Sequence, residues 1–171
     1  MPLPHPFYGL LPSGPKLVIS DGHKGIQAAV QKAFLGASWQ MCNVHFMRAV
    51  LENIPKKDKK EVAYMLKDAL EDERKMQEVA VILDGMGYKK SADTIDLFRF
   101  DLWNYKSFPR PHWRRIRTTN GLERINKELK RRSRVSGAYP NDQSLLRVAV
   151  SIMMNINEDW ITGNRYLPLE D

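Results

Sequence analysis

The sequence predicts a mostly helical α/β fold, in which a short layer of parallel strands precedes an all-helical stretch. Residues 16–55 follow the order strand, helix, strand, helix, which is typical of parallel strands joined by helical crossovers. Residues 56–108 carry apolar stripes at helical spacing and no strand-like run. The length of 171 residues and the hydrophobic content of 43% suit one domain, or one domain that carries an insertion.

The layer follows an irregular lead-in over residues 1–15, which holds five of the ten prolines. "KLVIS" (16–20) is short, apolar and β-branched, and it is followed by Asp21 and Gly22, as expected of a buried strand that ends at a turn. Apolar side chains then recur over residues 26–34 at i, i+3, i+4, i+7 and i+8. This spacing predicts an amphipathic helix that ends near Gly36.

The second half of the layer repeats the pattern. "SWQMC" (38–42) is the next expected strand, and "NVHFMRAVLENI" (43–54) is the helix after it, halted by Pro55. Residues 56–108 then show three stripes of helical spacing, which we expect to form an all-helical insertion. The members of the three stripes are Val62, Met65, Leu66, Ala69 and Leu70; Met76, Val79, Ala80 and Leu83; and Ile95, Phe98, Leu102 and Trp103.

Residues 109–171 are expected to hold two helices and an irregular tail. The basic segment 117–134 takes its buried stripe from Leu122, Ile125 and Leu129. The last helix takes its own buried stripe from Leu145, Val148, Ala149, Ile152, Met153 and Ile156.

The net charge of +7 is concentrated in one segment. Residues 110–134 hold ten Lys and Arg against Glu123 and Glu128, a net charge of +8, while the rest of the chain sums to −1. Such a concentration indicates a track for a polyanion such as nucleic acid. A solvated helix face is the alternative.

Several classes of protein are excluded by composition. No run of about eighteen apolar residues is present, so we expect no membrane-spanning helix and no membrane partner. The N-terminus lacks the basic start and apolar stretch of a secretory signal. Cys42 is the only cysteine, so no intrachain disulfide can form, and a cytoplasmic location is expected.

Asp21 is the first candidate for chemistry. It stands at the carboxyl end of the first expected strand, the edge of a parallel sheet where ligands gather. A carboxylate at that edge is suited to a hard divalent cation. The alternative is that Asp21 caps the next helix or supports a turn.

Glu123 is the second candidate. With Asn120 as N-cap, Glu123 occupies the third helical position, where a glutamate can fold back onto the cap and stabilise the helix by about 0.5–2 kcal/mol. Helical spacing also places Glu123 on one face with Asn126, Lys127, Lys130 and Arg134, opposite the apolar stripe. Such a face could bind a metal ion and the flanking phosphates together.

Two further groups carry open alternatives. Cys42 and His45, as "CNVH", resemble half of a zinc site, but a single cysteine excludes a thiolate-rich structural site, and a packed pair between strand and helix is favoured. The aromatic residues just before the basic helix could stack on bases, although packing in the core is favoured. These aromatic residues are Trp103, Tyr105, Phe108 and Trp113.

Taken in order, these blocks resemble the Mutator-type transposases of bacterial insertion sequences. "KLVISDGHKGIQAAVQKAFLGASWQMCNVHFMRAV" is similar to their second catalytic block, with a strand, an Asp, a helix and a C-x-x-H pair. "FPRPHWRRIRTTNGLERINKELKRRSRV" resembles their third block, which has a Thr-Asn-x-x-Glu-x-x-Asn pattern. "YPNDQSLLRVAVSIMMNINEDW" resembles their closing helix, and the resemblance covers residues 15–167.

The resemblance implies a partial RNase H-like core, with residues 56–108 as the helical insertion between the second and third acids. It implies that Asp21 and Glu123 are the second and third acids of a DDE triad, and that Cys42 and His45 are the family's C-x-x-H pair. In that family the acids hold two divalent ions, normally Mg²⁺, which serve DNA strand cleavage and strand transfer.

The resemblance also implies DNA, in the form of transposon ends, as the partner, and a nucleoid-associated location. A second copy of the chain or a full-length transposase is a further expected partner. The residues expected to hold the DNA backbone are Arg114, Arg115, Arg117, Asn120, Arg124, Asn126, Lys127, Lys130, Arg131, Arg132 and Arg134.

One catalytic residue of the family has no counterpart in this sequence. The family's first Asp lies upstream of the first block, and residues 1–20 contain no acid. The resemblance therefore implies a C-terminal part of the catalytic domain with an incomplete two-metal site, inactive alone. The alternative is a non-catalytic DNA-binding or regulatory remnant, such as a transposition inhibitor.

Overall fold

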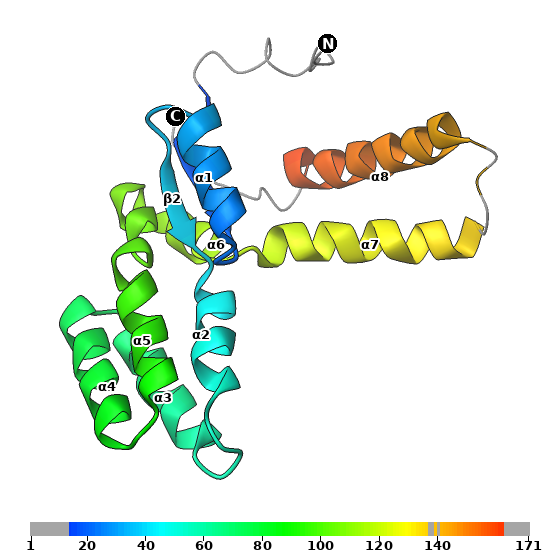
Figure 1. Cartoon of the computed structure of the whole chain (residues 1–171). Helices are drawn as coiled ribbons and strands as arrows, with labels where there is room; N and C mark the ends of the chain where they lie inside the picture. Colours follow the sequence, from blue (N-terminus) through cyan, green and yellow to red (C-terminus); the bar gives the residue numbers. More distant parts are fainter. Residues whose placement is uncertain (1–13, 137–138, 140, 163–171) are drawn as a thin grey trace. The chain divides into compact units, whose positions relative to one another are not determined.

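The computed structural model describes residues 14–136, 139 and 141–162, and it divides into two compact units, residues 1–107 and 108–171. The described part is mostly helical and contains one small parallel sheet, which confirms the mostly helical α/β class (Figure 1). The expected irregular lead-in lies almost entirely outside the described residues, as does the end of the tail. No helix among the described residues is long and apolar enough to cross a membrane.

The sheet of the first unit has two parallel strands, β1 (Leu17–Ser20) and β2 (Ser38–Met41). Helix α1 (Lys24–Ala33) connects them, and α2 (Asn43–Glu52) follows β2. The predicted order of strand, helix, strand, helix and the parallel pairing are therefore confirmed. In the register Leu17 pairs with Ser38.

Helix α1 is less covered than its apolar pattern indicates. Only Val30 is buried along this helix, and Ile26 is 39% exposed. Two short strands form a surface too narrow to cover the whole apolar face of a helix of this length. After α1 the chain turns at Gly36, whose φ of 87° lies in the left-handed region that glycine adopts without strain.

Four helices form the core of the first unit. Helix α2 packs against α3 (Lys59–Ala69) and α5 (Lys89–Phe98), and α4 (Glu73–Gly85) packs against the same two helices (Figure 1). The three predicted stripes supply most of this core. Their fully or nearly fully buried members are Val62, Leu66, Ala69, Met76, Val79, Ala80, Leu83, Ile95 and Leu102.

The chain returns to β2 through two 3₁₀ turns, η1 (Arg99–Asp101) and η2 (Asn104–Ser107). The buried Gln40 amide of β2 donates to the Leu102 carbonyl at 2.8 Å and accepts from the Tyr105 backbone N–H at 3.1 Å. A polar side chain thus joins the sheet to the end of the helical stretch. Because Tyr105 is buried, the core interpretation of this aromatic residue is confirmed.

The second unit begins with two short turns, η3 (Arg110–His112) and α6 (Trp113–Ile116). Two long helices follow, α7 (Asn120–Ser136) and α8 (Asp142–Thr162), which lie side by side (Figure 1).

The stripes predicted for these two helices are only partly buried. Ile152 is 3% exposed, whereas Leu122 is 58%, Leu145 43% and Met153 53% exposed. The prediction of a fully buried stripe was wrong at these three positions. Two helices alone offer each other a narrow seam, so the margins of both stripes stay open to solvent.

Candidate functional site

Asp21 is the first residue after β1 and is exposed at the carboxyl end of the strand. Its Oδ1 accepts a hydrogen bond from the His23 backbone N–H at 3.3 Å, which supports the turn into α1. The helix itself is capped by His23, whose Nδ1 accepts from the Gly25 N–H at 3.1 Å. The alternative that Asp21 caps the helix was therefore wrong, and the turn interpretation is confirmed.

The turn that carries Asp21 is held in place by its neighbours. The Ser20 hydroxyl donates to the Asp21 carbonyl at 2.8 Å and accepts from Trp39 Nε1 at 2.9 Å. Gly22 lies so close to α5 that an added Cβ would stand 2.5 Å from Cζ of Phe98. These contacts fix the backbone at Asp21, and a side chain at position 22 would require the Phe98 ring or the turn to move.

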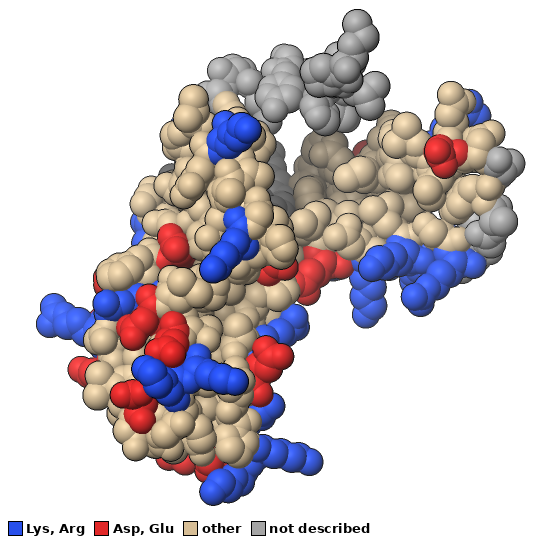
Figure 2. Space-filling model, in the orientation of Figure 1, with Lys and Arg blue, Asp and Glu red and all other residues tan. Residues whose placement is uncertain are grey.

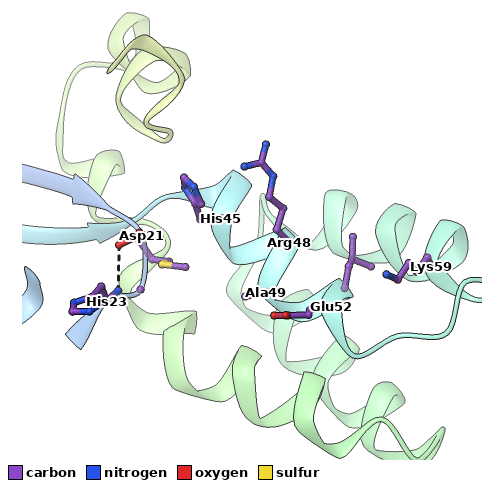
Figure 3. A pocket seen from close by; sticks show the side chains of 10 residues that line it. Asp21, His23, His45, Arg48, Ala49, Glu52 and Lys59 are labelled. Atoms are coloured by element: carbon purple, nitrogen blue, oxygen red, sulfur yellow. Dashed lines mark hydrogen bonds between the residues drawn. The ribbon is translucent and has the colours of Figure 1, made fainter. Parts of the chain in front are cut away.

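Asp21 shares a depression of about 760 Å³ with residues of α2 and the start of α3. Figure 3 shows Asp21 at one end, His45 and Arg48 on α2, and Lys59 at the other end. The lining residues are Asp21, Gly22, His23, Met41, His45, Arg48, Ala49, Leu51, Glu52 and Lys59. Sequence reasoning missed Arg48 and Lys59. For Arg48 a signal was present, because the spacing of His45, Arg48 and Glu52 places these three residues near one face of a helix.

The C-x-x-H pair is divided between core and surface. Cys42 is fully buried between β2 and α2, and its backbone N–H donates to the Ser20 carbonyl at 2.8 Å. His45 stands one turn later and is half-buried at the edge of the depression. The buried thiol supports the packing interpretation of Cys42, while His45 faces the same space as Asp21.

Asp21 fits the role of a single carboxylate ligand to a hard cation. Its carboxylate is exposed, and Oδ2 accepts no hydrogen bond from the described residues. Carboxylate oxygens are the ligands that Mg²⁺ prefers in proteins. Among the described residues, no group of three or more His, Cys, Asp or Glu side chains is placed to hold a metal ion.

Glu123 lies in the first turn of α7 and is exposed. The helix begins at Asn120, so the prediction of Asn120 as N-cap was wrong, and Thr119 precedes the first helical residue. The Thr119 hydroxyl donates to Glu123 Oε1 at 3.0 Å, and the Glu123 N–H donates to the Thr119 carbonyl at 2.9 Å. Glu123 is therefore bonded to the residue that precedes its helix, through the Thr119 hydroxyl, and the expected bond to the backbone of the cap stays a prediction.

Asp21 belongs to the first unit and Glu123 to the second. Each carboxylate is exposed within its own unit. Their convergence on a shared metal stays a prediction.

The predicted polar face of α7 is exposed along its length. Glu123, Asn126, Lys127, Lys130 and Arg134 are all open to solvent, and Figure 2 shows Lys and Arg side chains gathered along this helix. No ion pair joins Lys127, Lys130 or Arg134 to another described residue. These three cations are therefore available to phosphates.

Two arginines of α7 are engaged within the helix. Glu128 accepts from Nε and Nη2 of Arg131 at 2.9 and 2.8 Å, and from Nε of Arg132 at 2.8 Å. The hydrogen bonds from Arg131 and then Arg132 lower the pKa of Glu128 to about 2. Arg131 and Arg132 thus share one anionic partner, and they present less free charge than the sequence implies.

Comparison with known proteins supports the resemblance. Residues 12–163 match the family model described as "Transposase, Mutator family". The chain is similar to a transposase for insertion sequence element IS256 in transposon Tn4001 of Staphylococcus aureus, with 33% identity over 89% of the chain and 40% of the relative. It is also similar to a transposase for IS1081 of Mycobacterium tuberculosis, with 32% identity over 92% of the chain and 39% of the relative.

A third relative, a transposase for IS406 of Burkholderia multivorans, is 34% identical over 90% of the chain and 41% of its own length. The chain thus spans about 40% of the length of the curated relatives it matches.

Proposed function

Because the chain belongs to the Mutator family of transposases, we propose that it supplies two acids and a DNA-binding helix to a DNA transposase site. The reaction class is metal-dependent DNA strand cleavage and strand transfer by a DDE mechanism. The observation that carries this proposal is the placement of Asp21, an exposed carboxylate at the carboxyl end of β1 beside an open depression.

Asp21 and Glu123 are the residues that would hold Mg²⁺. Both side chains are exposed, and carboxylate oxygens are the ligands that Mg²⁺ prefers in proteins. When bound, the ions supply activation of a nucleophilic hydroxyl and stabilisation of the leaving oxygen. The first acid of the triad has no counterpart in residues 1–20, so we expect this chain alone to bind metal weakly and to cleave DNA poorly.

The exposed cations of α7 would bind the DNA backbone. Lys127, Lys130 and Arg134 follow helical spacing on one face, so they can contact successive phosphates. The Glu128-bound arginines are expected to contribute less. Transposon ends are the DNA that the resemblance to the family implies.

The parallel pair β1–β2 would be part of a larger RNase H-like sheet. In the described part of the chain each strand has one neighbour, and every residue of β1 is only half-buried. Residues 56–108 would be an insertion in that core, because η2 returns to β2 after three helices.

Metal binding tests this function. Mn²⁺ replaces Mg²⁺ at oxygen sites and is counted by electron paramagnetic resonance. We expect Asp21→Asn and Glu123→Gln each to weaken Mn²⁺ binding, and the double variant to lose little more than either single one, because both acids serve one site. Additive losses would show two independent sites and contradict the proposal.

A second candidate is a non-catalytic DNA-binding or regulatory protein, which the hydrogen bond between Thr119 and Glu123 favours because it gives Glu123 a structural role. This function predicts salt-sensitive DNA binding that survives Asp21→Asn and Glu123→Gln together. If DNA binding with Mn²⁺ is unchanged by loss of both acids, the second candidate is preferred.

A further inference from the structure

We propose that Arg48 binds a DNA backbone phosphate in the depression next to Asp21. This inference rests on the proposed function, since it takes the carboxyl end of β1 to face DNA. It adds a contact from the first unit to those expected of α7.

The position of Arg48 follows from the geometry of α2. His45 and Arg48 stand on successive turns, and Figure 3 shows His45 between Asp21 and Arg48. Arg48 is exposed, and its side chain extends away from Glu52, the acid four residues later. Although i,i+4 spacing allows an ion pair between Arg48 and Glu52, none is formed.

The guanidinium of Arg48 has no competing partner among the described residues. No carboxylate among the described residues lies within 4.0 Å of it, and no aromatic ring stacks on it. By contrast, Arg99 pairs with Asp96 at 3.7 Å and lies 4.5 Å from the ring centroid of Phe100. Within the part of the chain that the structure describes, the N–H donors of Arg48 are therefore available, in the fork geometry that binds phosphate oxygens in pairs.

The surroundings of Arg48 suit a phosphate that is part of a larger molecule. Met41, Ala49 and Leu51 contribute apolar groups to the lining of the depression. Lys59 supplies a second cation at the end remote from Asp21. The volume of about 760 Å³ is within the range of sites that hold small organic ligands, so one sugar-phosphate unit of a DNA strand fits.

DNA binding by the full chain over a range of salt concentrations tests the proposal. The probe is a fluorescein-labelled DNA duplex followed by fluorescence anisotropy. We expect Arg48→Gln to weaken binding about five- to tenfold at about 0.1 M salt and to reduce the slope of log K against log salt by about one. Arg48→Lys keeps the charge and should keep the slope.

Arg74→Gln is the matched control. Arg74 is also an exposed arginine of the first unit without an ion pair to the described residues, but it lies on α4 and does not line the depression. We expect the slope of log K against log salt for Arg74→Gln to equal that of the parent chain. Thermal unfolding of each variant verifies that the substitution, which is at an exposed position, leaves the fold intact.

The outcomes separate the two proposals. If the parent chain binds DNA but Arg48→Gln and Arg74→Gln behave alike, the role of Arg48 is overturned and the proposed function stands. If the parent chain does not bind DNA at all, both are overturned.

Discussion

Substituting Gly22 by Ala perturbs the turn that carries Asp21. The added Cβ would lie 2.5, 3.0 and 3.3 Å from three ring atoms of Phe98. Carbon atoms pack at about 3.5–4.0 Å, so the ring or the turn must move by roughly an ångström. Overpacking of this kind costs about 1–3 kcal/mol, and we expect the free energy of unfolding to fall by that amount.

Urea unfolding followed by circular dichroism measures this cost. Gly85→Ala is the control, since Gly85 ends α4 with nothing within 4 Å of its added Cβ, and it should be neutral or slightly stabilising. In a Phe98→Ala background, Gly22→Ala should cost almost nothing, because the obstructing ring is gone. A Gly22→Ala variant as stable as the parent, or one equally destabilised in both backgrounds, would refute this reasoning.

Three further substitutions have defined outcomes. Glu128 has its pKa lowered to about 2 from an ordinary 4.5, so its ion pairs stabilise α7 above about pH 4.5 and are lost as pH falls toward 2. Helical circular dichroism followed during acid titration measures this loss. The E128Q variant has no carboxylate at this position, so it should lose less helical signal than the parent between about pH 4.5 and pH 2. Identical titration curves for the two proteins would argue against the ion pairs. Gln40→Leu orphans the Leu102 carbonyl and the Tyr105 N–H at a cost of about 1–3 kcal/mol each, seen as a lower urea midpoint. Lys130→Gln should reduce the salt slope of DNA binding by about one, and an unchanged slope would remove Lys130 from the interface.

Local sequence patterns predicted the elements well because periodicity follows directly from helix and strand geometry. The stripe from Met76 to Leu83 is buried throughout, and both short strands lie where β-branched and apolar residues indicated. The start of α7 was misplaced by one residue because Thr119 and Asn120 are both good N-cap residues. Asn is the more preferred of the two at an N-cap, so the sequence preference pointed to the wrong residue.

Other features depend on residues that are distant in the chain. Gly22 is required because Phe98 of α5 packs on it, and no local pattern reveals that contact. Arg48 lies outside the basic segment, so charge clustering does not single it out; the depression that it shares with Asp21 does. The exposure of Leu122 follows from the small number of helices in its unit, which helical spacing cannot predict.

Iron-directed backbone cleavage tests most directly whether Asp21 and Glu123 share a metal site. Fe²⁺ in place of Mg²⁺, with ascorbate and peroxide, produces hydroxyl radicals that cut a chain close to the metal. We predict cuts beside both acids, and we predict that Asp21→Asn removes both sets of cuts. Cuts beside Glu123 that persist in the Asp21→Asn variant would show that the two carboxylates hold no common ion, and would contradict the proposed catalytic role.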